Sequence, residues 1–152
     1  MKKQLLSFWY AIRGIGGAFR TEAHLRFHLA AAVFVLIFAG ICGFSAERFA
    51  ILLALIGLVF ALELVNTAIE HACNAVTRDF HPQIKLAKDL AAGAVLAAAI
   101  CAAAVAVVFF LNAQAWQNAA AFFQANPLTI IPLVVLAAVC VLFVIFGGKK
   151  KK

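Results

Sequence analysis

Two glutamates interrupt a long apolar stretch in the middle of this 152-residue chain. Glu63 and Glu70 lie on one face of a helix, because about 100° of rotation per residue brings every seventh residue back into line. That face carries further polar side chains and comprises Glu63, Asn66, Thr67, Glu70, Asn74 and Thr77. An ionisable group near the middle of a membrane helix costs about 2.5 kcal/mol or more, which indicates a functional site. The alternative is that both glutamates are merely solvated at the helix end, or paired with Arg78 or Lys85.

Three more ionisable residues are expected close to this face. Glu22 precedes the first long apolar stretch, and Lys88 and Asp89 precede the third, so all three belong to the same side of the membrane as the end of the polar face. Carboxylates suit a hard divalent cation such as Mg²⁺, and a nearby lysine suits the phosphate oxygens to which such a cation bridges. The set favours phosphoryl transfer, although the sequence has no glycine-rich loop of either familiar phosphate-binding type.

Three histidines, His24, His28 and His71, raise the alternative of a zinc site. His24 and His28 share one helix face, but no cysteine or third ligand is placed to complete such a site, and the carboxylates favour a harder ion. We interpret His28 as a packing or hydrogen-bonding residue.

The composition predicts the environment in which these residues work. Hydrophobic residues make up 66% of the chain and charged residues 12%, whereas soluble domains are roughly 45–50% apolar. We therefore expect an all-α integral membrane protein, with no large soluble catalytic domain. Four apolar stretches have about the length that spans a bilayer, and they cover residues 27–44, 49–76, 90–111 and 128–146. The formal net charge of +7 reflects membrane topology and contact with anionic lipid, so no nucleic-acid partner is expected.

The basic residues predict how these stretches are oriented. If successive connections lie on opposite sides of the membrane, twelve of the 13 Lys and Arg residues fall on one side and only Arg48 on the other. The positive-inside rule then predicts that both termini are cytoplasmic. The uncharged connection at 112–127, which contains Trp116, would lie on the outer surface.

Two further patterns complete the expected organisation. The first 26 residues carry apolar side chains at helical spacing, which predicts an interfacial amphipathic helix or, alternatively, a helix packed on a partner; no cleaved signal peptide is expected. Gly93, Ala97 and Cys101, at four-residue spacing, predict close packing of the third stretch inside the bundle or between subunits.

We divide the chain into an interfacial segment (1–26), a three-helix membrane core (27–111), an external loop (112–127) and an additional membrane helix with a lysine-rich cytoplasmic tail (128–152).

Three spaced blocks of sequence stand out, namely ELVNTAIE at 63–70, DFHP at 79–82 and AKDLAAGAV at 87–95, and they are preceded by FRTE at 19–22 with Arg26 and His28. Together these blocks resemble the small prokaryotic diacylglycerol kinase and undecaprenol kinase family. The resemblance covers about residues 7–111 and leaves the last 41 residues outside it. It implies a lipid kinase of the bacterial inner (cytoplasmic) membrane that uses ATP and Mg²⁺. It also implies a homotrimer with active sites at the cytoplasmic surface, between subunits that each carry an interfacial helix and three membrane helices.

The same resemblance implies a role for each matching residue. Glu63 would be the general base on the lipid hydroxyl, and Glu22 and Glu70 would hold Mg²⁺ with ATP. The nucleotide site would consist of Asn66, His81, Lys88 and Asp89. The depth of the carboxylates supports this division, since Glu63 lies farther from the helix end than Glu70 and a carboxylate removed from water is the stronger base. One departure is Asn74, which stands where the family often has an aspartate.

Two short motifs bear on the lipid acceptor. FHP at 80–82 and AAGA at 91–94 look closer to the undecaprenol kinase branch, so we expect undecaprenol, with diacylglycerol as the alternative. A function of another class would be an ion transporter or a noncatalytic membrane bundle. A transporter needs polar groups through the whole membrane depth, whereas the other three stretches are almost free of charge inside. A noncatalytic relative would have lost the carboxylates that this chain retains.

Overall fold

The computed structural model describes residues 2–77 and 79–148 of the chain. Within this part the chain forms six α-helices and one short 3₁₀ helix, and no strand. The elements are α1 (Lys2–Thr21), α2 (Ala23–Ile41), α3 (Ala46–Val76), α4 (Pro82–Phe110), α5 (Ala113–Ala125), η1 (Pro127–Thr129) and α6 (Ile130–Phe146). Four segments are long and apolar enough to span a membrane, namely α2, α3, α4 and Pro127–Phe146, which confirms the predicted fold class. Arg78 and the lysines at 149–152, which contribute to the predicted charge asymmetry, lie outside the described residues.

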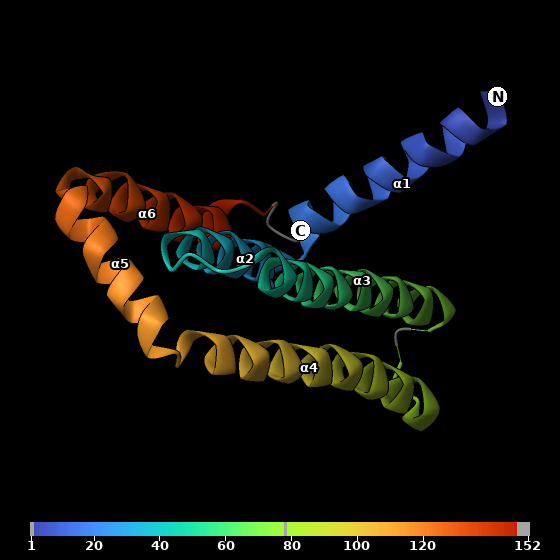
Figure 1. Cartoon of the computed structure of the whole chain (residues 1–152). Coiled ribbons are helices and arrows are strands. Elements are labelled where there is room, and N and C mark those ends of the chain that lie inside the picture. The colour runs from blue at the N-terminus through green and yellow to red at the C-terminus, as the bar shows by residue number, and fades with distance from the viewer. Residues whose placement is uncertain (1, 78, 149–152) are drawn as a thin grey trace.

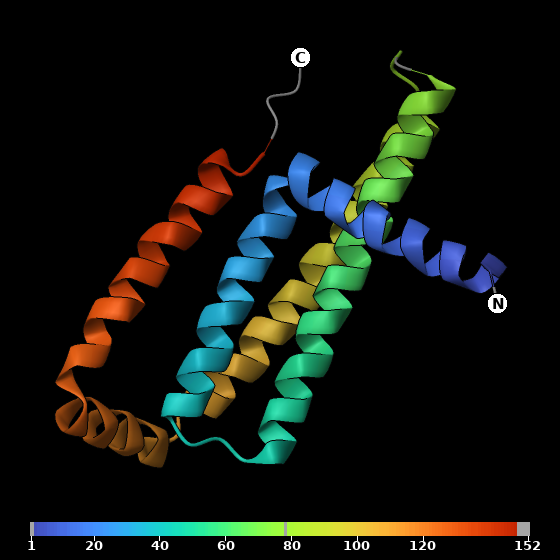
Figure 2. The same cartoon turned by 90° about the horizontal axis from the view of Figure 1, so that it is seen from above.

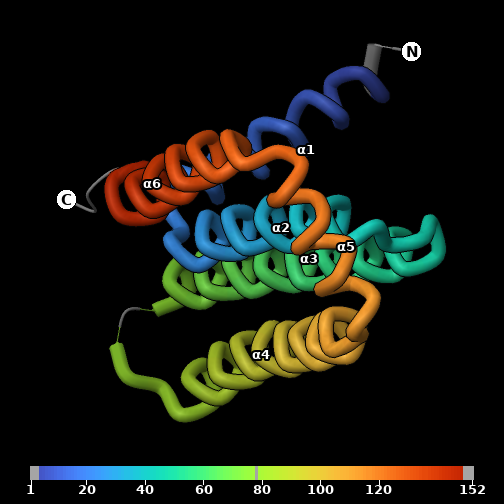
Figure 3. Tube along the Cα trace, turned by 60° about the vertical axis from the view of Figure 1, so that its left-hand side comes forward, coloured from blue at the N-terminus to red at the C-terminus, as the bar shows by residue number. Residues whose placement is uncertain are grey.

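The spanning helices form a row in the order α6, α2, α3 and α4 (Figure 3). Helix α3 packs on both α2 and α4, and α6 packs on α2. Figure 1 shows α4 in a separate layer beside the other three. Helix α1 crosses one end of the row and α5 crosses the opposite end (Figure 2). The end of α3 that carries its polar face therefore lies at the same end of the bundle as α1.

Helix α1 is continuous although three glycines stand in its sequence. Its apolar side chains, Phe8 and Trp9 among them, remain exposed along most of its length. Its C-terminal end packs on the bundle, where the ring centroids of Phe19 and Phe60 lie 6.2 Å apart. The amphipathic helix is confirmed, and its open apolar face suits the predicted place at a membrane interface.

Helix α5 occupies the connection at 112–127 that the sequence predicts as an external loop. Asn112 caps its first turn by accepting a backbone hydrogen bond at 2.9 Å. Ala115 and Ala119 are buried against the end of α2, and Asn118 donates to a backbone oxygen of the α2–α3 turn at 2.9 Å. Helix α5 is difficult to predict from the sequence because it contains no charged residue. The difference in polarity between its buried alanines and its exposed amides is therefore small.

Helix α4 packs on α3 and buries Val95 and Ala98. The small residues Gly93, Ala97 and Cys101 lie on another face and are exposed. Of the two roles predicted for this stripe, packing inside the bundle of one chain therefore does not hold, and a contact between subunits stays a prediction.

The buried side chain of Arg26 joins three helices at the α1 end of the bundle. Arg26 lies on α2 and is 4% exposed. Its Nη1 donates to the carbonyl oxygen of Phe19 at 2.9 Å, and its Nε donates to that of Val144 at 3.3 Å. These carbonyls belong to the last turns of α1 and α6, where helices lack internal partners and carry the negative end of their dipole. Gly148 lies so close that an added Cβ would be 2.8 Å from Nη2 of Arg26. One guanidinium thus fixes α1 and α6 to α2.

Arg26→Ala should loosen both helices and lower the thermal unfolding midpoint of the purified protein in detergent. Each hydrogen bond from a charged donor contributes about 1.5–3 kcal/mol, so a loss of at least that size is expected. Arg20→Ala removes an exposed arginine from α1 and serves as the matched control. Equal midpoints for the two variants would show that the guanidinium does not hold the helices.

Candidate active site

Glu63 is a buried carboxylate that faces a histidine. It lies on α3 and is 6% exposed. Its Oε1 is 3.3 Å from Nε2 of His28 on α2. Among the described residues, no lysine or arginine forms an ion pair with Glu63. The contact agrees with the interpretation of His28 as a packing or hydrogen-bonding residue, and it leaves Oε2 of the carboxylate available.

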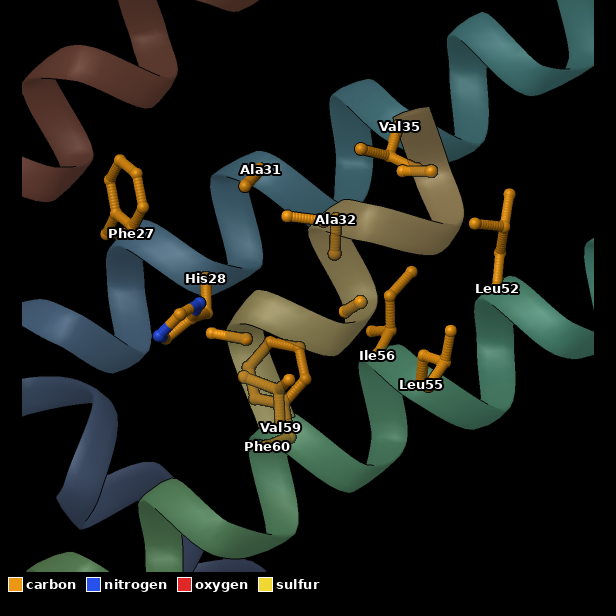
Figure 4. A pocket seen from close by; sticks show the side chains of 14 residues that line it. Phe27, His28, Ala31, Ala32, Val35, Leu52, Leu55, Ile56, Val59 and Phe60 are labelled. Atoms are coloured by element: carbon orange, nitrogen blue, oxygen red, sulfur yellow. The ribbon is translucent and has the colours of Figure 1, made fainter. Parts of the chain in front are cut away.

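An apolar cavity of about 340 Å³ lies between α2, α3 and α4, with His28 of this pair in its wall (Figure 4). His28 and Phe60 line the end nearest Glu63, and Val35 and Leu52 line the far end. The remaining lining is aliphatic or aromatic, so His28 contributes the polar part of the wall. Such a cavity suits a hydrocarbon chain whose polar end meets the Glu63 carboxylate.

Asn66 and Glu70 form a second polar group farther along α3. The amide Nδ2 of Asn66 donates to Oε1 of Glu70 at 3.4 Å. Its Oδ1 is buried and has no hydrogen-bond partner within the described part of the chain. If Nδ2 and Oδ1 of Asn66 were exchanged, Oδ1 would face Oε1 of Glu70, and two acceptor oxygens would repel each other. The hydrogen-bond pattern therefore fixes the orientation of the Asn66 amide. An orphaned amide oxygen beside a carboxylate is a donor set that fits Mg²⁺, which prefers oxygen ligands.

Lys88 and Asn74 connect α4 to α3 near the end of the polar face. The Nζ atom of Lys88 donates to Oδ1 of Asn74 at 2.7 Å. Asn74 departs from the family pattern, in which an aspartate is common at this position. Its amide oxygen nevertheless accepts the hydrogen bond from Lys88. An amide carries no charge, so Asn74 does not neutralise the ammonium group of Lys88. The positive charge of Lys88 therefore suits a phosphate group.

The other predicted site residues lie apart from these groups. Glu22 is half-buried at the N-cap of α2, with no side-chain hydrogen bond to that helix. His81 is exposed at the N-cap of α4, and Asp89 is exposed and pairs with Lys85 at 3.3 Å. Within residues 2–77 and 79–148, no three His, Cys, Asp or Glu side chains come close enough together to hold a metal ion. The role of Glu22 as a metal ligand therefore stays a prediction.

Two functional contacts are not visible in the sequence. The His28–Glu63 pair depends on how α2 is rotated and shifted against α3, which the hydropathy of either helix does not determine. The clue was that His28 stands at the start of an apolar stretch, where a histidine needs a partner when buried. The Lys88–Asn74 bond likewise depends on the crossing of α3 and α4.

The groups on α3 are ordered from the membrane interior to the helix end. Glu63 contacts His28 in the cavity wall, Asn66 and Glu70 follow, and Asn74 with Lys88 comes last. From Glu63 to Asn74 the helix rises about 16 Å at 1.5 Å per residue. The arrangement can therefore bring an apolar molecule from one direction and a polyanion with its cation from the other.

Known proteins are similar to this chain over about two thirds of its length. The family described as prokaryotic diacylglycerol kinase matches residues 9–110. Undecaprenol kinase of Bacillus subtilis is 46% identical over 109 residues, which are 69% of this chain and 85% of that protein. Diacylglycerol kinase of Synechocystis is 42% identical over 102 residues, 66% of this chain and 58% of that protein. Diacylglycerol kinase of Pseudomonas aeruginosa is 32% identical over 94 residues, 62% of this chain and 76% of that protein. No solved structure matches the chain.

The matched region contains every side chain described above for the candidate active site, whereas α5 and α6 lie beyond it. The match covers well over half of the chain, and the predicted resemblance is confirmed. The chain belongs to the prokaryotic diacylglycerol kinase family.

Proposed function

We propose that this membrane lipid kinase transfers the γ-phosphoryl group of ATP to the hydroxyl of undecaprenol, in a Mg²⁺-dependent reaction with Glu63 as general base. The observation that carries the proposal is the buried Glu63 carboxylate, which contacts His28 in the wall of an apolar cavity. A lipid alcohol reaches Glu63 through the cavity, and the nucleotide reaches it along the polar face of α3.

The transfer itself needs a base and an aligned acceptor. The hydrocarbon chain of the acceptor lies in the cavity, and its hydroxyl meets the Glu63 oxygen that does not face His28. The hydroxyl oxygen attacks the γ-phosphorus as its proton passes to Glu63, the bond to the bridging oxygen breaks, and ADP leaves. The apolar walls limit the access of water, which would otherwise compete as the acceptor.

The nucleotide end of the site holds charge. Bound Mg²⁺ would neutralise the phosphate oxygens in the transition state. Glu70 and the orphaned oxygen of Asn66 would hold it, together with Glu22. Lys88, oriented by Asn74, contacts the phosphates. His81 and Asp89, both exposed at the start of α4, line the nucleotide pocket.

Undecaprenol is favoured over diacylglycerol as the acceptor. The relative named undecaprenol kinase is 46% identical and is matched over 85% of its length. Diacylglycerol remains the second candidate because relatives at 42% and 32% identity are named diacylglycerol kinases.

The protein works as a homotrimer in the bacterial inner membrane, with the polar end of α3 toward the cytoplasm, where ATP is found. The exposed stripe of small residues on α4 supports contacts between subunits. A neighbouring subunit would also supply the groups that Glu22 needs to complete the metal site. The basic residues predicted on this side favour the same orientation.

The acceptor is tested by offering undecaprenol and diacylglycerol in parallel to the purified protein, with γ-labelled ATP and Mg²⁺ in detergent. Labelled phosphate should appear on undecaprenol at the higher rate. Faster labelling of diacylglycerol would contradict the proposed acceptor. No transfer to either lipid by a properly folded protein would contradict the proposed reaction and favour a noncatalytic bundle.

Glu63→Gln should reduce kcat by at least about 100-fold, because it removes the base without changing the volume of the side chain. The matched control is Glu47→Gln, which makes the same change on the same helix at an exposed position at the opposite end. The control should keep the rate of the unmodified protein. Near-normal turnover by Glu63→Gln would exclude Glu63 as the base.

A further inference from the structure

The imidazole of His28 lines the apolar cavity and also contacts the buried Glu63 carboxylate. Its Nε2 is 3.3 Å from Oε1 of Glu63, and their side chains are only 21% and 8% exposed. Within the described residues, no other side chain forms an ion pair or hydrogen bond with the Glu63 carboxylate. The orientation of this carboxylate therefore depends on one contact.

We infer that His28 is a positioning residue for Glu63, whose imidazole turns one carboxylate oxygen toward itself and so presents the other to the acceptor hydroxyl. This inference rests on the proposed function of Glu63 as the base. His28 touches neither the nucleotide nor the phosphate in this account, and it acts through Glu63.

The positioning role requires one tautomer of the imidazole. A carboxylate oxygen accepts hydrogen bonds, so Nε2 of His28 must carry the hydrogen that faces it. At 3.3 Å the pair is longer than the ~2.7–2.9 Å of a tight charge-assisted hydrogen bond. Catalytic contacts of this kind commonly shorten when the substrate is bound, and an acceptor chain in the cavity would press on the His28 ring.

The surroundings of His28 hold the ring in place. The ring of Phe27 lies edge-on to it at a centroid distance of 5.8 Å, and Phe60 lines the same end of the cavity. Two residues earlier in the sequence, Arg26 ties α2 to the ends of α1 and α6. The hydrogen bonds of Arg26 to the ends of α1 and α6 thus also help to fix the position of His28 on α2.

A double-mutant cycle tests the inference through kinetics. His28→Leu should lower kcat by about tenfold to a hundredfold, the size expected for a misplaced catalytic group, while KM for ATP stays unchanged. His28→Gln retains an amide N–H at the distance of Nε2 and should recover most of the rate. In the Glu63→Gln background, where no base remains to be positioned, His28→Leu should have no further effect.

Several kinetic outcomes would overturn the positioning role. One is that His28→Leu lowers the residual rate of Glu63→Gln by the same factor as it lowers the rate of the unmodified protein. Another is that His28→Leu raises KM for ATP and leaves kcat unchanged. Loss of activity in His28→Gln equal to that in His28→Leu would also count against it, since the retained donor would then serve no purpose.

Nuclear magnetic resonance tests the pair without relying on activity. In protein labelled with ¹⁵N at its histidines, the ring signals lost in His28→Gln identify His28. These signals should shift in Glu63→Gln and stay unchanged in Glu47→Gln. Unchanged signals in Glu63→Gln would overturn the pair whatever the kinetics. If the unmodified protein transferred no phosphate, the proposed function would fail even where these shifts established the contact.

Discussion

Keeping a carboxylate inside an apolar helix bundle is the constraint on which this site depends. Removing such a group from water is costly unless a polar partner compensates for the loss. Glu63 has His28 as that partner, 3.3 Å away on the neighbouring helix. The contact requires α2 and α3 to lie side by side at one register, and Arg26 secures α2 at the same end by binding the last turns of α1 and α6. The geometry of the base therefore rests on the packing of four helices.

The same constraint explains how one helix can serve two reactants of opposite character. The part of α3 before Glu63 lines the apolar cavity, and the part after it carries Asn66, Glu70 and Asn74. The polar groups of the site are thereby confined to one end of α3, where water and a nucleotide can reach them. Helix α6 lies beyond the family match and adds no polar side chain to the site. Its contribution is the carbonyl oxygen of Val144, which accepts a hydrogen bond from Arg26.

Much of this could be predicted from the sequence because the signals were strong and local. Long apolar runs predicted the spanning helices, and the 3.6-residue period placed Glu63 and Glu70 on one face. The block at 63–70, whose family match is now established, predicted the lipid kinase. Helix α5 was missed because a helix without charges shows little contrast along its length.

The contacts between helices could not be predicted in the same way. Hydropathy fixes which residues lie in the membrane, but rotation and register decide which side chains meet. For this reason the partner of Glu63 and the bond between Lys88 and Asn74 emerged only from the packed structure. Glu22 marks a further limit, since in one chain it joins no group of three possible metal ligands among the described residues.

In the proposed reaction, a lipid alcohol enters the cavity that His28 lines next to Glu63. A polyprenol carrying a photoreactive group on its first isoprene unit measures this directly, with the attachment sites located by mass spectrometry. We expect labelling of cavity residues near His28 and Phe60 that is suppressed by added undecaprenol. Labelling spread over the outward faces of α4 and α6, unaffected by the competitor, would contradict it.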